Sequence, residues 1–261
     1  MPLSPGDQVA GYKIESVVAR GGMGVVYRAR HAELGRSVAL KVIAADRAGD
    51  ETFRKRFVRE ARLAASLDHP NVIPVFEAGD DDGLLFIAMR LVEGSDLERL
   101  IAADGPLAPA LAVRLIEQAA AGLDAAHARG LVHRDIKPAN ILLAGPPADP
   151  HVYVTDFGVA TSLAPNRPLT LASEWVGTAG YAAPEQTQGG AVDARADVYA
   201  LGCVLFAALH GRPPFTHGPG GGGPLDQVVA RALSRRPDDR YDSAGDLAAA
   251  ARAALPEAEV A

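Results

Sequence analysis

The chain has 261 residues, of which 48% are hydrophobic and 22% charged, and its formal net charge is −6. This composition is typical of a soluble globular protein with one large core or two lobes, and the negative balance disfavours general electrostatic binding of nucleic acid or anionic lipid. No apolar run reaches about 18 residues and the first residues do not resemble a signal peptide, so we expect a cytoplasmic segment without membrane contact. A longer parent could still carry a membrane anchor.

The first third of the sequence predicts a β-meander followed by one helix. Apolar and β-branched residues favour strands, a glycine-rich segment at 19–24 separates the first two, and a helical apolar stripe follows. A bend at Glu93-Gly94 predicts a lobe boundary, with lobes at 1–93 and 94–261. The predicted strands are 12–18, 25–30, 37–43, 72–77 and 84–89, and the helix is 51–67.

The remainder of the sequence predicts a mainly helical lobe. A long alanine-rich helix at 109–129 is ended by Gly130, and a short hairpin joins 141–143 to 152–154. Further helices are predicted at 193–209, 225–233 and 243–254. The single cysteine, Cys203, lies in an apolar run, which favours a buried core residue, and the segment 216–224 (THGPGGGGP) has the composition of a flexible linker.

The glycine-rich segment and the strand after it suggest a phosphate site. The segment joins strand to strand and lacks the lysine of a Walker loop, so both the dinucleotide-binding fold and the P-loop are disfavoured. The remaining interpretation is a glycine-rich flap whose backbone amides can approach phosphate oxygens, because side chains are absent. Lys41 alone could be an ordinary surface lysine. Glu60, however, falls in the apolar stripe of helix 51–67, where a carboxylate needs a cation, so we expect these two side chains to pair.

The stretch LVHRDIKPANILL, residues 131–143, places charged and amide side chains between two apolar flanks. The polar residues are His133, Arg134, Asp135, Lys137 and Asn140. Asn140 and Asp156 flank the predicted hairpin on its outside, so they should lie at the same open end. Amide and carboxylate oxygens are ligands that suit Mg²⁺, which predicts a magnesium site there.

Taken together, these motifs resemble the signature set of the protein kinases over residues 10–252. HRDIKPAN resembles the serine/threonine branch, while GGMGVVYRAR, GTAGYAAPEQ and DVYALGCVLFAALHGRPPF resemble the eukaryotic-like kinases of bacteria, especially actinobacteria. The resemblance implies an α+β, bilobal protein-kinase-like fold, with a small, mainly antiparallel N-lobe carrying one helix and a larger, mainly helical C-lobe. It implies transfer of the γ-phosphoryl of ATP to serine and threonine hydroxyls of proteins.

The same resemblance implies a role for each chemical residue. Asp135 would accept the proton of the substrate hydroxyl, Lys137 would steady the γ-phosphate, and Asn140 and Asp156 would hold Mg²⁺, with Mn²⁺ as a substitute. Lys41 would bond the α- and β-phosphates, and Glu60 would position Lys41. Thr178 would bond Asp135 and Lys137 and help to admit serine or threonine. His133 and Phe157 would join an apolar spine, which argues against a metal role for His133.

ATP contacts are implied for the flap, the adenine slot and the hinge. The residues that would wall the adenine slot, Val18, Val26, Ala39, Met89 and Leu142, could instead be plain core residues. The flap and slot residues are Val18, Ala19, Arg20, Gly21, Gly22, Met23, Gly24, Val26, Ala39, Met89 and Leu142, and the hinge residues are Arg90, Leu91 and Val92.

Regulation and folding features are implied as well. The activation segment would span 156–185. Thr170 and Ser173 in this segment would be phosphorylation sites, and their phosphates would offer an anion to the Arg134 cation. One kinase copy would phosphorylate another at these sites. Glu185 and Arg240 would form a buried ion pair, and Asp197 would brace the catalytic loop.

Two departures from the pattern keep other readings open. Ala19 replaces the first flap glycine, and the linker 216–224 replaces a helix that the family usually has. The missing helix motivates a pseudokinase that binds nucleotide or partners without catalysis. A small-molecule phosphotransferase is a third reading, which GTAGYAAPE disfavours because peptide-positioning residues have no use with a small alcohol.

Overall fold

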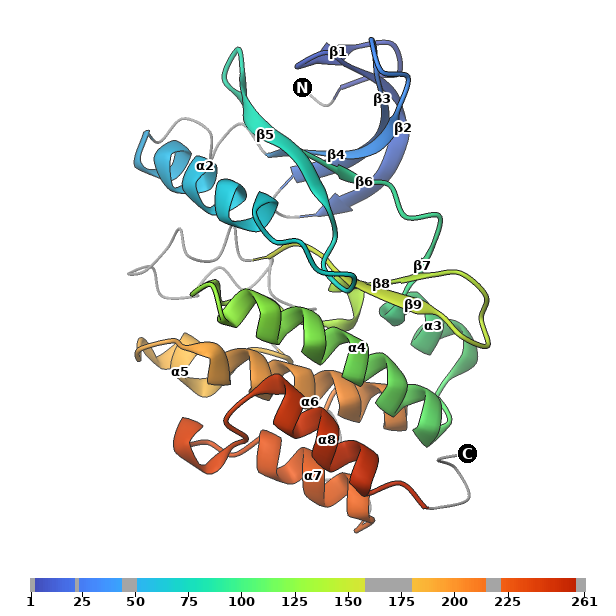
Figure 1. Cartoon of the computed structure of the whole chain (residues 1–261), viewed down its shortest axis with the longest axis vertical. Helices are drawn as coiled ribbons and strands as arrows, with labels where there is room; N and C mark the ends of the chain where they lie inside the picture. Colours follow the sequence, from blue (N-terminus) through green and yellow to red (C-terminus); the bar gives the residue numbers. More distant parts are fainter. Residues whose placement is uncertain (1–2, 22–23, 44–50, 158–179, 215–221, 257–261) are drawn as a thin grey trace. The chain divides into compact units, whose positions relative to one another are not determined.

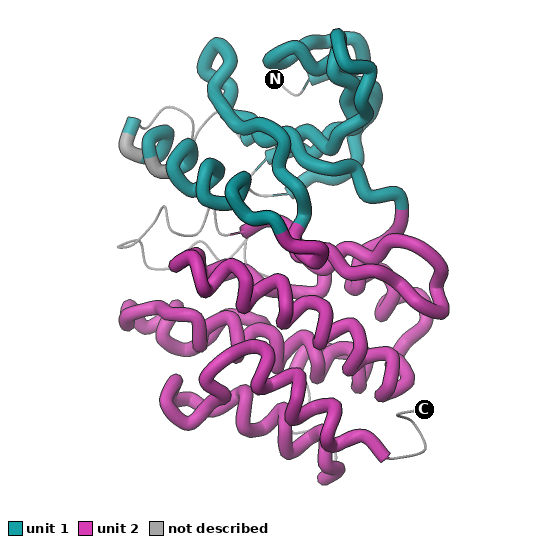
Figure 2. Tube along the Cα trace, in the orientation of Figure 1, with its two compact units in different colours: residues 1–68, 73–93 teal, residues 69–72, 94–261 magenta. Residues whose placement is uncertain are grey.

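The computed structural model describes residues 3–21, 24–43, 51–157, 180–214 and 222–256, without the side chains of Thr52 and Arg56. The chain divides into two compact units (Figure 2). The first unit contains residues 1–68 and 73–93, and the second contains 69–72 and 94–261. Thr170, Ser173 and Thr178, with Gly22 and Met23, lie outside the described residues, as does most of the linker 216–224.

A six-stranded antiparallel sheet and the helix α2 make up the first unit (Figure 1). The sheet order is β1-β2-β3-β4-β6-β5. The strands are β1 (Gln8–Val9), β2 (Tyr12–Gly21), β3 (Gly24–His31), β4 (Ser37–Ile43), β5 (Val75–Asp81) and β6 (Leu84–Arg90), and the helix is α2 (Glu51–Ala65). The strand predicted at 37–43 is confirmed at both ends, whereas β1 was not predicted.

The two faces of this sheet differ because side chains alternate along each strand. Val38, Leu40 and Val42 of β4 belong to a core cluster that also contains Tyr27 and Phe86. The residues between them, Ala39 and Lys41, therefore belong to the opposite face. Regular alternation thus separates the structural side of the strand from the side that carries Lys41.

The second unit consists of helices and a three-stranded antiparallel sheet in the order β7-β8-β9 (Figure 1). The strands are β7 (Gly94–Asp96), β8 (Ile141–Ala144) and β9 (His151–Val154). The helices are α3 (Leu97–Asp104), α4 (Pro109–His127), α5 (Pro184–Gln188), α6 (Ala194–His210), α7 (Pro224–Ala232) and α8 (Ala244–Ala253), with short 3-10 turns η1 (Pro138–Asn140) and η2 (Pro237–Asp239). The antiparallel first unit and helical second unit confirm the predicted fold class.

Helix α6 is the most enclosed element of the second unit. Every residue from Ala196 to Ala208 is buried, so the helix is covered around its whole circumference. Cys203 is fully buried within it, and burial raises the pKa of its thiol. The thiol therefore stays protonated and serves as a core side chain, as its apolar surroundings in the sequence predicted.

Residues 69–72 precede a strand of the first unit but pack with the second. Val72 forms an isolated parallel bridge with Val154, and the carbonyl of Asn71 accepts the N–H of Val154 at 2.8 Å. Helix α4 has Gly122 at this point, where a Cβ would lie 2.8 Å from the Asn71 carbonyl oxygen. The strand predicted at 72–77 was therefore wrong at its start, because Val72 forms its bridge with Val154 of the second unit.

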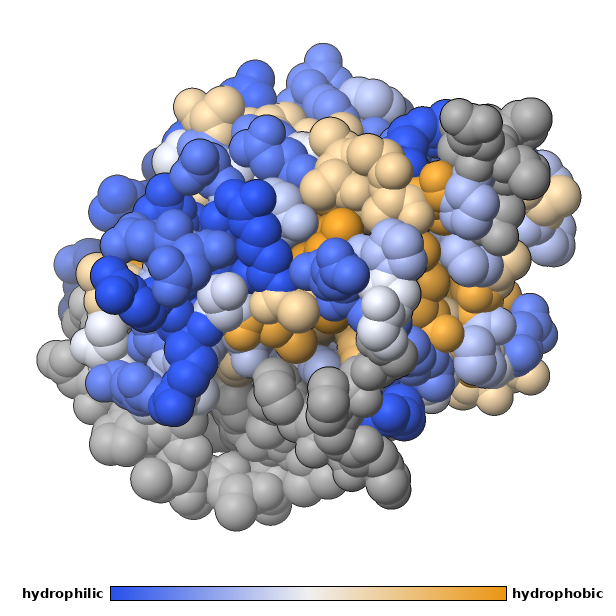
Figure 3. Space-filling model, turned by 90° about the horizontal axis from the view of Figure 1, so that it is seen from below, coloured by the Kyte–Doolittle hydropathy of each residue, from blue (hydrophilic) through white to orange (hydrophobic). Residues whose placement is uncertain are grey.

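The helices within the described ranges include no candidate for a membrane span. No helix there is both long and apolar enough to cross a bilayer. The face seen in Figure 3 is mostly hydrophilic, with smaller patches of hydrophobic side chains between the polar ones.

Candidate active site

The loop between α4 and β8 is held by one buried carboxylate. Asp197, in the first turn of α6, is fully buried and accepts the backbone N–H groups of His133 and Arg134, each at 2.7 Å. His127, at the end of α4, lies with Nε2 2.7 Å from the same carboxylate. A buried carboxylate with three hydrogen bonds is well satisfied. The loop backbone is thereby fixed to α6, as the resemblance implied for Asp197.

We expect Asp197→Asn to loosen this loop. The amide would turn an N–H toward a donor, leaving a buried N–H without an acceptor and lowering the free energy of unfolding by about 1–3 kcal/mol. Urea denaturation measures this change. Asp193→Asn, at the exposed N-cap of α6, is a matched control expected to stay within about 0.5 kcal/mol, because asparagine caps helices as well as aspartate. Equal losses in both variants would contradict the bracing role.

His133 is a structural side chain. It is fully buried, its Nε2 lies 2.8 Å from the carbonyl oxygen of Thr155, and its Nδ1 accepts the N–H of Asp135 at 3.3 Å. Its ring centroid lies 4.7 Å from that of Phe157. Since both ring nitrogens are engaged and the ring packs on an aromatic side chain, His133 has no free position for a metal.

Asp135 has a carboxylate with two distinct oxygens. Oδ2 accepts Lys137 Nζ at 2.9 Å and Asn140 Nδ2 at 3.2 Å, and the backbone carbonyl of Asp135 accepts the same amide nitrogen at 2.7 Å. The side chain is 17% exposed. No hydrogen bond to Oδ1 is present within the described part of the chain. The carboxylate is therefore oriented through one oxygen and can accept a proton at the other.

Asn140 and Asp156 flank the β8–β9 hairpin at its open end. The ladder pairs Ile141 with Val154 and continues one step, since the N–H of Thr155 donates to the Asn140 carbonyl at 3.0 Å. Asp156 follows with φ of +62°, a left-handed conformation that few non-glycine residues adopt. The hairpin topology predicted from the sequence is confirmed.

The oxygen atoms at this end suit a magnesium ion. Asn140 donates from Nδ2 to Asp135, so its Oδ1 remains to act as a ligand. The Asp156 carboxylate is the second candidate ligand. Across the ranges described, no group of three or more His, Cys, Asp and Glu could hold a metal. In proteins Mg²⁺ is usually bound through one or two carboxylates together with substrate phosphates and water.

In the first unit, four predicted ATP-contacting residues share one face of the sheet. The register pairs Val26 with Lys41 and Ala39 with Met89, and residues two apart on a strand point the same way. Lys41 is half-buried on β4, and Glu60 is half-buried on α2. Opposite the core cluster, this face combines a cation with small and apolar side chains.

The remaining predicted nucleotide contacts are scattered over strand ends. Strand β2 carries Val18, which is 46% exposed, and Ala19, Arg20 and Gly21. Strand β6 ends at the exposed Arg90, and the half-buried Leu91 and Val92 follow it. Strand β8 carries Leu142. Gly24 opens β3 with φ of +151°, and a Cβ there would overlap the carbonyl oxygen of Val42. The sheet itself therefore requires this glycine, whatever the flap binds.

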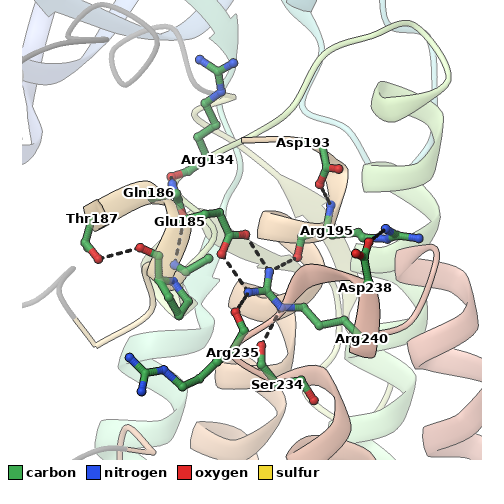
Figure 4. A network of polar contacts seen from close by, with 12 residues as sticks. Arg134, Glu185, Gln186, Thr187, Asp193, Arg195, Ser234, Arg235, Asp238 and Arg240 are labelled. Atoms are coloured by element: carbon green, nitrogen blue, oxygen red, sulfur yellow. Dashed lines mark hydrogen bonds and ion pairs between the residues drawn. The ribbon is translucent and has the colours of Figure 1, made fainter. Parts of the chain in front are cut away.

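Glu185, on α5, and Arg240 form a bidentate ion pair (Figure 4). The oxygen–nitrogen distances are 2.7 and 2.8 Å, and the arginine side chain is completely buried. Gln186 follows Glu185 and donates from Nε2 to the Arg134 carbonyl at 2.8 Å. The side chain of Arg134 points away from this network (Figure 4). The start of α5 is thereby tied to the loop between α4 and β8.

Sequence reasoning missed two of these supporting residues, His127 and Gln186. His127 lies in the last turn of α4, and Gln186 lies next to Glu185. Both act through backbone or carboxylate partners that are far away in the chain, 70 residues for His127 and 52 for Gln186. A single histidine or glutamine gives no signal for such a partner.

Comparison with known proteins gives consistent results. A family model described as protein kinase domain matches residues 12–236. Serine/threonine-protein kinases PknH and PknE of Mycobacterium tuberculosis are 42% and 41% identical to the chain, each over 97% of it. The chain spans under half of these relatives, 43% of PknH and 48% of PknE. A crystal structure of the Mycobacterium tuberculosis PknI kinase domain matches with a TM-score of 0.80 and 33% identity, covering 97% of this chain and 100% of that one.

The family match covers both compact units, from β2 of the first to the segment after α7 of the second. The order of the motifs, the sheet order and the helical second unit all agree with it. The chain therefore belongs to the protein kinase domain family, as a bacterial eukaryotic-like serine/threonine kinase domain.

Proposed function

We propose that this domain transfers the γ-phosphoryl group of ATP to serine and threonine hydroxyls of proteins, acting in the cytoplasm. The observation that carries the proposal is the arrangement of Asp135, whose Oδ2 is held by Lys137 and Asn140 while Oδ1 has no hydrogen bond within the described residues. A carboxylate held in this way accepts the proton of an attacking hydroxyl. Named serine/threonine kinases at 41–42% identity support the choice of reaction.

The proposed mechanism assigns one task to each side chain. Asp135 orients the acceptor hydroxyl and takes its proton, and Lys137, bonded to Asp135 at 2.9 Å, brings a positive charge to the transferred phosphoryl group. Lys41 binds the α- and β-phosphates, with Glu60 as the proposed anion that positions it. Use of ATP and a divalent metal is general in the family.

Asn140 and Asp156 are the proposed ligands of the metal ion, with Mg²⁺ preferred and Mn²⁺ as a substitute. When bound, the ion would neutralise phosphate charge and orient the nucleotide. We expect Asp156→Asn to raise the magnesium concentration needed for half-maximal activity by tenfold or more, by loss of a charged oxygen ligand. A magnesium titration of phosphorylation measures this. Asp149→Asn, at an exposed aspartate of the β8–β9 loop, is the control, and identical titrations for the two variants would contradict the assignment.

Phosphosite mapping tests the proposed activity together with its regulation. After incubation with ATP and Mg²⁺, we expect phosphate on Thr170 or Ser173, placed there by a second copy of the kinase. Phosphorylation of a generic basic protein on serine and threonine, without phosphorylation of aminoglycosides or choline, would separate the proposal from a small-molecule phosphotransferase. Absence of any transfer from ATP to protein would support a pseudokinase instead.

A further inference from the structure

Arg212 follows the end of α6 and has no task in the mechanism proposed above. The residue is half-buried, and its Nη1 is enclosed by the protein without a hydrogen-bond partner. No ion pair to Arg212 is present in the part of the chain that the structure describes. A guanidinium keeps its charge in proteins, and burying its N–H groups without an acceptor costs free energy. An anion that reaches any nitrogen of the group offsets this cost, because the charge is delocalised over all three.

An aromatic ring supports the guanidinium. Its central carbon lies 5.4 Å from the centroid of the Phe206 ring. The same ring packs on His210 with centroids 4.3 Å apart, and His210 Nε2 lies 2.9 Å from Oδ1 of Asp226 on α7. Oδ2 of Asp226 accepts the N–H of Gly223 at 3.1 Å, so both oxygens of this carboxylate are used by other groups. The cation–π contact holds Arg212 in place and consumes none of its N–H donors.

Contacts within the second unit connect this arginine to the loop that carries the proposed base. Pro213, the next residue, packs on Gly180, where a Cβ would lie 3.4 Å from the Cβ of Pro213. Three residues after Gly180, the N–H of Ala183 donates to Oε1 of Gln186 at 2.9 Å. Gln186 in turn donates to the carbonyl of the residue before Asp135. Three extended residues span about 10 Å, so the arginine lies a short run of contacts away from the proposed site of phosphoryl transfer.

A protein substrate can bring an anion to this place. When its acceptor hydroxyl lies at Asp135, an extended substrate covers about 3.3 Å per residue, so side chains a few positions away reach Arg212. A single arginine contributes little to holding a free anion from solution. A substrate that is already held by its acceptor residue presents a carboxylate at a high effective concentration. Carboxylates also match the guanidinium fork, because they accept two parallel N–H bonds from it.

We propose that Arg212 is a specificity-determining residue, which selects protein substrates with an aspartate or glutamate within about six residues of the phosphorylated serine or threonine. The inference rests on the proposed kinase function, because the carboxylate is recognised on a segment that reaches Asp135. It adds a substrate class to that function: serine and threonine sites with a nearby acidic side chain.

Degenerate peptide libraries test the proposal on the intact chain with ATP and Mg²⁺. Each library has a central serine and one fixed position, up to about six residues to either side, that holds glutamate or glutamine. We expect the wild type to phosphorylate the glutamate library about tenfold faster than the glutamine library at one or two positions. In Arg212→Gln this ratio should fall to about one. In Arg212→Lys it should be intermediate, because lysine keeps the charge but lacks the planar fork.

The matched control is Arg236→Gln, at a side chain of the second unit that is 77% exposed, and we expect it to keep the wild-type ratio. A wild-type ratio near one at every position, or a ratio that Arg212→Gln leaves unchanged, would overturn the assignment. An equal loss with glutamate and glutamine libraries would overturn it as well, since the guanidinium would then serve the chain itself. Thermal unfolding of Arg212→Gln would show whether that service is to the fold.

The same libraries distinguish a failure of this inference from a failure of the proposed function. Phosphorylation of the glutamine libraries without any preference for glutamate would refute the role of Arg212 and leave the kinase function standing. Absence of phosphoryl transfer to every library would refute both.

Discussion

Replacing Asp135 with asparagine is expected to lower kcat for protein phosphorylation by roughly 10²–10⁴-fold, the usual contribution of a general base. The asparagine keeps the size of the side chain and can still accept from Lys137 and Asn140, as Oδ2 does now at 2.9 and 3.2 Å. It cannot take a proton from the acceptor hydroxyl. ATP affinity and the free energy of unfolding should therefore remain near wild type, and the loss should fall on kcat.

Steady-state kinetics with a basic protein substrate, together with nucleotide binding by titration calorimetry, would measure both parts of this expectation. Asp149→Asn is the matched control, because the same chemical change there affects an aspartate that is 84% exposed. A kcat within about twofold of wild type for Asp135→Asn would remove Asp135 as the base. A large loss of stability in that variant would instead indicate a structural role.

Replacing Arg240 with methionine is expected to lower the free energy of unfolding by about 3–5 kcal/mol, because it leaves the Glu185 carboxylate without its cation in a buried environment. Arg240 is completely buried, and its guanidinium contacts both oxygens of Glu185. It also donates to the carbonyls of Ser234 and Arg195, each at 2.9 Å. Methionine fills a similar volume but satisfies none of these acceptors.

The matched control for this substitution is Arg252→Met. Arg252 pairs with Glu117 at 3.3 Å, but the two side chains are 46% and 31% exposed, and such surface pairs contribute at most about 1 kcal/mol. Chemical denaturation of the two variants compares the same side-chain change in a buried and an exposed pair. Losses that differ by less than about 1 kcal/mol would mean that water reaches the Glu185–Arg240 pair.

Local patterns in the sequence were enough to predict most elements of the fold. Apolar and β-branched residues placed the strand at 37–43, and the apolar run around Cys203 placed α6 within one residue at each end. Such patterns are visible because a strand or helix must bury one side whatever its partner is. The proposed metal ligands were also predictable, since Asn140 and Asp156 flank a hairpin whose two strands are neighbours in the chain.

Elements defined by a distant partner could not be predicted in this way. Strand β7 has three residues and no alternation of its own, and it exists because β8 offers it an edge. Val72 reads as part of the following strand, but the hydrogen bonds of 69–72 are made with β9 and α4. In both cases the hydrogen-bonding partner, and not the local sequence, selects the conformation.

The sequence alone determined which chemical groups this domain has and in what order: a glycine-rich flap, a lysine, a pinned Asp-x-Lys-x-x-Asn loop and a second aspartate. Only the tertiary structure decided how the loop is held. Asp197, which His127 contacts, accepts its backbone N–H groups, and Gln186 of α5 donates to one of its carbonyls. The physical reason is that the spacing of apolar residues reflects the burial of one side of a helix or strand, which each element needs by itself. A buried polar side chain is instead satisfied by a distant donor or acceptor that only the folded chain brings to it.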